Sequence, residues 1–95
     1  MLKKDEIKYL RQLGQELNPI FQVGKSGLSE DLIEGVNQAL EKRELVKISI
    51  LQNCPIDKEE VFFDLQAFTK SEAVQKIGKT IVLYRKSKDG NHLLK

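Results

Sequence analysis

Residue types that build catalytic and metal sites are scarce in this sequence. It contains one cysteine, Cys54, one histidine, His92, and no tryptophan. A single cysteine excludes an intrachain disulfide, which fits a reducing compartment. Cys54 and His92 do not lie in a ligand-spaced cluster, so we expect neither a metal ion nor another cofactor. No acid–base pair or catalytic triad can be assembled from them and surface carboxylates. The sequence therefore predicts a protein that is not an enzyme and takes no small-molecule substrate.

Long apolar runs are missing as well. No stretch approaches the roughly 20 apolar residues that span a membrane. The first residues, Met-Leu-Lys-Lys-Asp-Glu, contain no apolar segment of signal-peptide type, so we expect a cytoplasmic protein without a membrane partner. Of the 95 residues, 40% are hydrophobic and 32% are charged. This composition suits one folded domain over residues 1–95, expected to be a monomer, with a short polar tail from about residue 87.

Charges of the two signs nearly balance, with a net charge of +2, but they are unevenly distributed. Residues 57–72 are rich in Asp and Glu, whereas residues 76–95 are rich in Lys and Arg. A surface polarised in this way can steer a polyanion toward the protein. A solvated basic tail beside a solvated acidic helix would give the same pattern, so charge alone leaves both interpretations open.

Three segments have the apolar spacing of amphipathic helices. The first covers residues 3–17 and stops at Asn18-Pro19, because the residue before proline avoids helical geometry. The second follows Ser29, and the third follows Asp57; both residues are good N-caps. We expect Val61, Phe62, Leu65 and Phe68 of the third segment to face the core, together with Phe21, which lies between the first two segments.

Strands are predicted over residues 20–23, 45–51 and 80–84. Within 45–51 the residues Val46, Ile48 and Ile50 alternate with Lys47 and Ser49, so the apolar three should share a buried face. The stretch before Gly78-Lys79 fits either a capped helix or a strand that forms a hairpin with 80–84. We favour the hairpin.

With the hairpin, the order of elements is α-β-α-β-α-β-β. Alternation of helices and strands predicts an α/β fold with parallel pairing, and the last two strands add an antiparallel pair. Three helices and four short strands suggest a two-layer fold with a four-stranded mixed sheet.

A glycine-flanked loop, Gly24-Lys25-Ser26-Gly27, joins the first predicted strand to the second helix. Glycines permit close approach of a ligand, successive backbone N–H groups can form an anion-binding concavity, and the helix N-terminus favours negative charge. Lys25 adds a positive charge and Ser26 a hydroxyl. A sugar-phosphate backbone would meet all of these groups.

The alternative is an ordinary strand-to-helix turn that needs glycine only for its dihedral angles. The spacing matches neither a Walker loop nor a Rossmann fingerprint.

Four stretches of the chain resemble the CRM domain family, in particular its single-domain bacterial YhbY-like group. They are residues 18–28 (NPIFQVGKSGL), 39–41 (ALE), 44–48 (ELVKI) and 74–85 (VQKIGKTIVLYR). Together with the first helix they cover nearly the whole chain. The segment around Phe62-Phe63 and the residues after Lys86 have no counterpart in this resemblance.

The resemblance implies a fold like the C-terminal domain of translation initiation factor three, and RNA binding through a GxxG loop of the kind found in KH domains. It further implies a role in ribosome assembly, since bacterial members of the family associate with precursors of the large ribosomal subunit. The loop is Gly24, Lys25, Ser26 and Gly27, and a second basic segment supplies Lys79, Arg85 and Lys86.

Some residues and one function remain open at this point. Lys47 points out of its predicted strand and fits either an RNA contact or a solvated residue. Arg85 and Lys86 follow the last strand. They lie either on the rim that carries the loop or at the strand end, which they would cap. The alternative function is a protein-interaction module that docks on a ribosomal protein or an RNA-processing factor through the acidic third helix.

Overall fold

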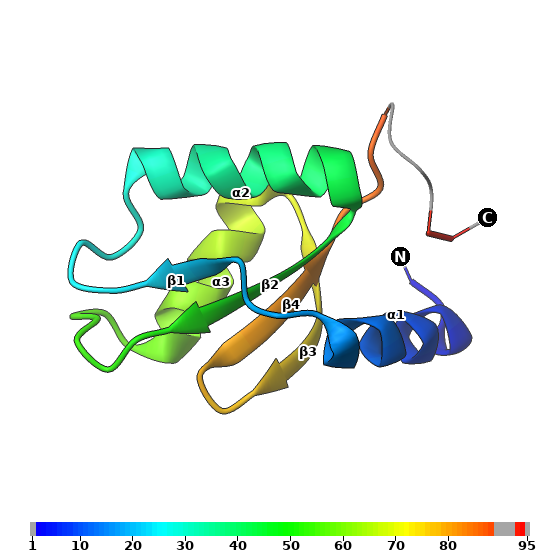
Figure 1. The fold of residues 1–95 in the computed structure, drawn as a ribbon, viewed down its shortest axis with the longest axis horizontal. Coiled ribbons are helices and arrows are strands. Elements are labelled where there is room, and N and C mark those ends of the chain that lie inside the picture. Colours follow the sequence, from blue (N-terminus) through cyan, green and yellow to red (C-terminus); the bar gives the residue numbers. More distant parts are fainter. Residues whose placement is uncertain (1, 89–92, 95) are drawn as a thin grey trace.

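The computed structural model describes residues 2–88 and 93–94 of the chain. Seven elements follow one another in the predicted order, and the stretch before Gly78 is a strand (Figure 1). They are α1 (Lys4–Glu16), β1 (Phe21–Val23), α2 (Glu30–Arg43), β2 (Leu45–Ile50), α3 (Lys58–Thr69), β3 (Glu72–Ile77) and β4 (Thr80–Tyr84). None of the helices in this described part of the chain is long and apolar enough to cross a membrane.

The strands form a mixed four-stranded sheet in the order β1-β2-β4-β3. β1 runs parallel to β2, whereas β4 is antiparallel to both β2 and β3. The mixed sheet and the closing hairpin are therefore confirmed. The carboxyl ends of β1 and β2 lie at one end of the sheet, and the β3–β4 turn lies there too, because Ser49 pairs with Thr80.

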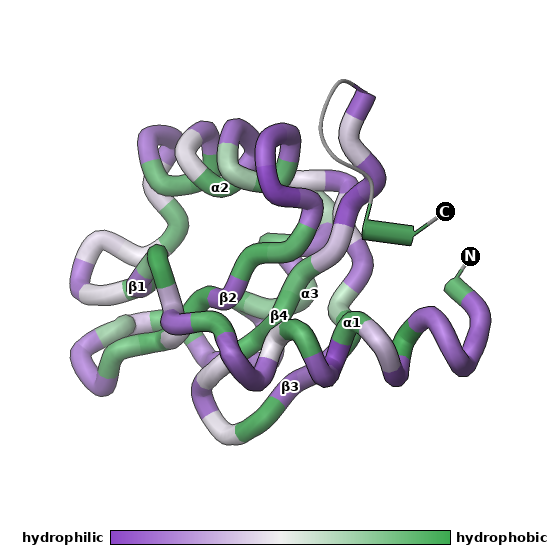
Figure 2. The backbone as a smooth tube through the Cα atoms, turned by 45° about the vertical axis from the view of Figure 1, so that its right-hand side comes forward, coloured by the Kyte–Doolittle hydropathy of each residue, from purple (hydrophilic) through white to green (hydrophobic). Residues whose placement is uncertain are grey.

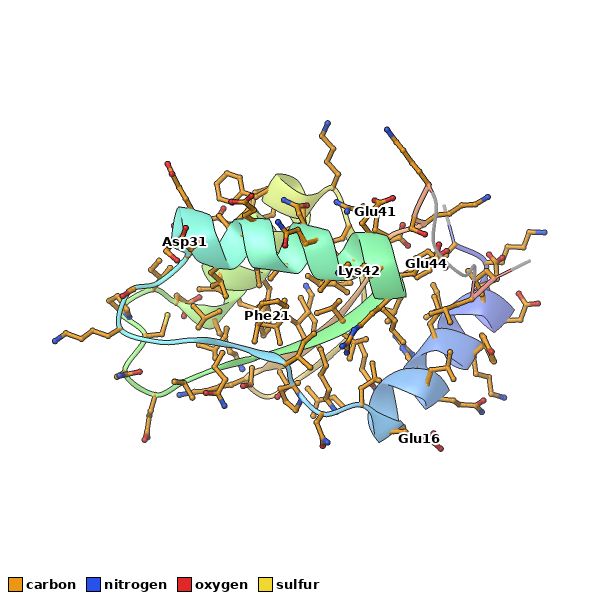
Figure 3. The ribbon with its side chains drawn as sticks, turned by 45° about the horizontal axis from the view of Figure 1, so that its top comes forward. Glu16, Phe21, Asp31, Glu41, Lys42 and Glu44 are labelled. Carbon is orange, nitrogen blue, oxygen red and sulfur yellow. The ribbon has the colours of Figure 1, made fainter. Side chains whose placement is uncertain are left out.

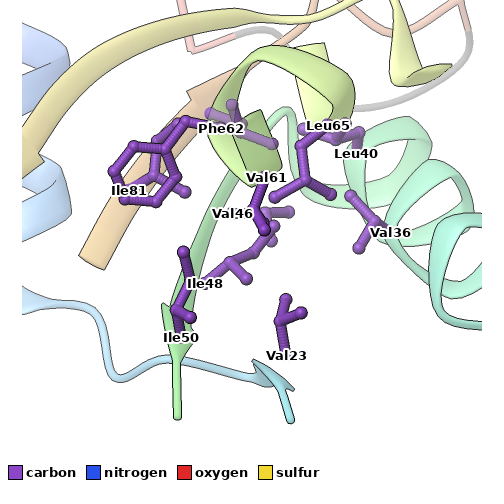
Figure 4. Packing of buried hydrophobic residues seen from close by; sticks show 11 residues of the cluster. Val23, Val36, Leu40, Val46, Ile48, Ile50, Val61, Phe62, Leu65 and Ile81 are labelled. Carbon is purple, nitrogen blue, oxygen red and sulfur yellow. The ribbon is translucent and has the colours of Figure 1, made fainter. Parts of the chain in front are cut away.

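The main core lies between one face of the sheet and the helices α2 and α3. Val46, Ile48 and Ile50 all point into it and are at most 6% exposed, as their alternation predicts. Phe62 enters the same core from α3 and lies over Ile81 (Figure 4).

The helix α1 packs on the other face of the sheet, so the fold has a partial third layer where two layers are expected. Its Leu10 joins a second cluster with Leu45, Val82 and Tyr84. Leu45, Val82 and Tyr84 lie on the same face of the sheet as Lys47 and Ser49, so this face carries both apolar and polar residues. Apolar and polar residues alternate along α1 (Figure 2), and the helix covers the half of this face where the strands are apolar.

Two expectations about exposure are wrong. Phe68 is 56% exposed, because the inward position in the last turn of α3 is taken by Thr69, which is fully buried. The chain from about residue 87 is not simply a polar tail, since Ser87 is 3% exposed and its N–H donates to a carboxylate oxygen of the buried Glu44 at 2.6 Å. Leu93 also donates its N–H to Glu44, at 2.7 Å. His92 lies outside the described residues.

Candidate functional site

The glycine-flanked loop is a closed turn between β1 and α2. The N–H of Gly27 donates to the carbonyl of Gly24 at 2.9 Å, and Gly27 adopts a left-handed φ of 63°. Lys25 and Ser26 occupy the two central positions and are exposed. Within residues 2–88 and 93–94, the backbone N–H groups of Lys25 and Ser26 donate to no protein acceptor. The tip of the turn therefore offers a cation, a hydroxyl and two free amides to solvent.

The two glycines also let this loop pack on the neighbouring β2–α3 loop. A Cβ on Gly24 would lie 3.2 Å from Cδ1 of Leu51, and a Cβ on Gly27 would lie 3.1 Å from Cδ1 of Ile56. The N–H of Leu51 donates to the carbonyl of Val23 at 2.8 Å and ties the loops together. The space left by the missing side chains is thus filled by Leu51 and Ile56, whereas Lys25 and Ser26 at the tip are exposed.

The helix α2 begins directly after the loop. Ser29 caps it, because its Oγ accepts from the N–H of Leu32 at 3.2 Å. Glu30 and Asp31 follow in the first turn, where the helix dipole favours carboxylates, and Asp31 points outward at the start of the helix (Figure 3). These two negative charges already occupy the positive end of the dipole, so the loop tip is a more favourable place for an anion than the helix end.

Two further lysines lie at the same end of the sheet as the loop. The carbonyl of Lys79, in the β3–β4 turn, accepts from the N–H of Ile50 at the end of β2. Lys58, at the start of α3, donates from Nζ to the carbonyl of Gly78 in that turn at 3.4 Å. Lys25, Lys58 and Lys79 are all exposed. We call these three residues the basic rim.

Lys58 is a member of the rim that sequence reasoning missed. The signal for it was present: Lys58 follows the cap Asp57 and begins the helix after β2, and the carboxyl ends of two parallel strands meet at the same end of a sheet. The pairing of β1 with β2 therefore brings the starts of α2 and α3 together.

The structure puts Arg85 and Lys86 at the opposite end of the sheet. The guanidinium of Arg85 donates to Oδ1 and the carbonyl of Asn37, at 2.8 and 2.9 Å, and to the carbonyl of Thr69 at 2.7 Å. It also forms an ion pair with Glu41 at 3.3 Å. Arg85 thus joins the end of β4 to α2 and α3. Lys86, by contrast, is exposed.

Lys47 lies between the two ends, on the face covered by α1. Its Nζ donates to the carbonyls of Gly14 and Leu17, each at 3.3 Å. A cation is favourable there because the last carbonyls of a helix lack intrahelical partners. Lys47 therefore caps the carboxyl end of α1.

The opposite end also contains a cleft of about 460 Å³. Lys70 and Lys86 line it together with Glu6, Glu72 and Tyr84, so its charge is mixed. Burial raises the pKa of the Tyr84 hydroxyl above its ordinary value of 10.0, and the nearby carboxylates of Glu44 and Glu6 raise it further. Tyr84 is thus a neutral core residue at physiological pH.

Comparison with known proteins agrees with this architecture. The CRS1/YhbY (CRM) domain matches residues 2–85. The chain is 45% identical to the probable RNA-binding protein YqeI of Bacillus subtilis, over 98% of this chain and 97% of that protein. It is 31% identical to a protein of Haemophilus influenzae named RNA-binding protein, over 93% of this chain and 89% of the other.

A solved structure is similar as well. The solution structure of a hypothetical protein from Staphylococcus aureus, described as a candidate RNA-binding protein, superposes with a TM-score of 0.76 at 46% identity. The match covers 94% of this chain and 93% of that one. These relatives are named for RNA binding and not for a catalysed reaction. The chain therefore belongs to the CRS1/YhbY (CRM) domain family.

Proposed function

We propose that this protein binds structured RNA and serves as a ribosome assembly factor that contacts the precursor RNA of the large subunit. The observation that carries the proposal is the juxtaposition at one end of the sheet. The free amides and the ammonium group at the tip of the glycine-flanked loop lie at the same end as Lys58 and Lys79. The names of the relatives support RNA as the ligand.

The proposed contact is made with the sugar-phosphate backbone. Lys25 neutralises a phosphate, and the N–H groups of Lys25 and Ser26 donate to its oxygens. Lys79 and Lys58 neutralise phosphates farther along the strand. Contacts of this kind position an RNA without reading its bases, and their affinity falls as the salt concentration rises.

The eight residues expected from the sequence then have different roles. Gly24 and Gly27 shape the loop, and Lys25, Ser26 and Lys79 contact RNA. Lys47 and Arg85 hold α1, α2 and α3 in place, because their donors already have acceptors within the protein. Lys86 contacts only an RNA that extends to the opposite end of the sheet. We further propose that the protein acts as a monomer, in the cytoplasm, without catalysis.

The first test measures the affinity of the purified protein for large-subunit ribosomal RNA by fluorescence anisotropy. Lys25→Ala should raise the Kd about tenfold, as expected for the loss of one charged hydrogen-bonded contact. Lys42→Ala is the matched control, because Lys42 is exposed at the far end of α2 (Figure 3). Equal affinities of the two variants would refute the role of the loop.

The second test identifies the RNA. Ultraviolet crosslinking in cells, followed by sequencing of the bound fragments, should recover large-subunit precursor RNA with the wild type and much less with Lys25→Ala. Recovery of messenger or transfer RNA in its place would keep RNA binding and reject the role in ribosome assembly.

A further inference from the structure

The outer side of α3 carries two exposed phenylalanines. Phe63 is 71% exposed and Phe68 is 56% exposed, whereas Phe62, beside Phe63 in sequence, is 1% exposed in the core (Figure 4). A large aromatic side chain gains about 1.5–3 kcal/mol when it leaves water. Two of them within five residues on one helix are a feature that the stability of the fold does not explain, because neither lies in the core.

The two rings flank a strip that covers more than a third of the helix circumference. A helix turns by about 100° per residue, so Phe63 and Phe68 point about 140° apart and lie about one and a half turns apart along the axis. Glu60, Asp64 and Ala67 point between the two rings. Counted from Phe63, Glu60 is three residues before, Asp64 is one residue after and Ala67 is four residues after, which puts all three within the arc from Phe63 to Phe68. Of these, Glu60 and Ala67 are exposed and Asp64 is half-buried. We call these five residues the α3 face.

Negative charge dominates this face. Among the residues that the structure describes, the carboxylates of Glu60 and Asp64 form no ion pair. Lys58 does not neutralise them, because its Nζ is directed to the carbonyl of Gly78 in the β3–β4 turn. Lys70, the C-cap of α3, lies about one and a half to three turns beyond Asp64 and Glu60 along the helix.

Charge decides between the possible occupants of the α3 face. An RNA or an anionic lipid surface would bring negative charge against Glu60 and Asp64. A second copy of the chain, paired about a two-fold axis through this face, would oppose carboxylates to carboxylates. A protein segment with apolar anchors and Lys or Arg between them complements both the rings and the charge.

We propose that the α3 face docks a basic amphipathic segment of a partner protein. Its apolar side chains bury Phe63 and Phe68, and its basic side chains pair with Glu60 and Asp64. Aromatic anchors of this kind dominate binding energies at small interfaces. The surface is separate from the glycine-flanked loop, so a partner protein and an RNA can be held at the same time, and either proposal can fail without the other.

Photocrosslinking from the full-length protein tests this. Benzoylphenylalanine replaces Phe63 in one variant and Ile77 in a matched control, since Ile77 is 62% exposed but lines a groove with Gln15 of α1 and Lys47, on the face of the sheet opposite α3. After irradiation in cells and nuclease treatment, the adduct at position 63 should be a protein. Mass spectrometry should map it to a segment with a net positive charge and apolar residues at regular spacing.

A synthetic peptide of the crosslinked segment then measures the affinity. The double variants Phe63→Ser/Phe68→Ser and Glu60→Lys/Asp64→Lys should each raise its Kd at least about tenfold. Phe63→Ser/Phe68→Ser changes no charge and should leave RNA affinity unchanged. Glu60, Phe63 and Phe68 are exposed and Asp64 is half-buried, and circular dichroism verifies that the variants fold. An adduct with RNA, an adduct with a second copy, an adduct no stronger than at position 77, or an unchanged Kd would each overturn the proposal.

Discussion

Lys25 and Arg85, at opposite ends of the sheet, use their positive charges in opposite ways. At the end with the glycine-flanked loop, Lys25, Lys58 and Lys79 are exposed, and most of their donors face solvent. At the other end, Arg85 directs its guanidinium to Asn37, Thr69 and Glu41 inside the protein. A positive charge in a family motif can therefore hold the fold together or meet a ligand, and only its hydrogen-bond partners distinguish the two roles.

Arg85→Ala should give the largest effect on stability. It removes the guanidinium donor from the carbonyls of Asn37 and Thr69 and the ion pair with Glu41, which should lower the free energy of unfolding by about 3 kcal/mol. Chemical denaturation measures this, with Lys86→Ala as the neighbouring exposed control. A stable Arg85→Ala protein with weakened RNA binding would reverse the comparison and make Arg85 a ligand contact.

Gly27→Ala should cause the second largest loss of stability. The left-handed φ of 63° is unfavourable for alanine by about 1–2 kcal/mol, and the new methyl group would lie 3.1 Å from Ile56. Gly78→Ala is the matched control, because Gly78 has a φ of 55° and a Cβ there would meet no heavy atom within 4 Å. Thermal unfolding should show a larger loss for Gly27→Ala. Equal losses would mean that the contact between the two loops contributes nothing.

The double variant Lys25→Ala/Lys79→Ala should weaken RNA binding without loss of stability. Each phosphate contact contributes about 0.7–0.9 to the slope of log affinity against log salt concentration, so the slope should become shallower by about 1.4–1.8. Anisotropy titrations at several salt concentrations measure this. Lys42→Ala should leave the slope unchanged, and an unchanged slope in the double variant would remove the basic rim from the interface.

Tyr84→Phe should give the smallest effect, visible only at high pH. The folded state raises the pKa of Tyr84 above 10.0, so the unfolded chain loses this proton first. The contribution of the neutral hydroxyl is complete below pH 10.0 and is lost as the pH rises through the folded pKa. The wild type should thus lose more stability than Tyr84→Phe above that pH. Tyr9→Phe, at a residue 45% exposed, should behave as the wild type does.

Local signals in the sequence predicted the elements well. Ser29 and Asp57 cap α2 and α3 as expected, and the alternation in β2 gave the correct buried face. These signals act within a few residues, so no knowledge of the rest of the chain is needed. The inward position of Phe68 was wrong because the apolar stripe of α3 ends on Thr69, a residue that hydropathy does not mark as buried.

The candidate site was less accessible to such reasoning. The glycine-flanked loop could be found from its spacing, but the sequence could not tell whether Arg85 lies beside it. That depends on β4 running antiparallel to β2, which carries Arg85 away from the loop and brings Lys79 to the same end of the sheet. Lys47 is similar, since its partners on α1 are 30 or more residues away in sequence.

The sequence by itself determined the order of the elements, their caps, the turn that needs glycine and the family, because periodicity and short-range hydrogen bonding are local properties. The tertiary structure alone decided which cations share an edge, which are held inside the fold, and that Phe63 and Phe68 remain in water. Those outcomes depend on strand order and on contacts between distant segments, which a local pattern does not contain.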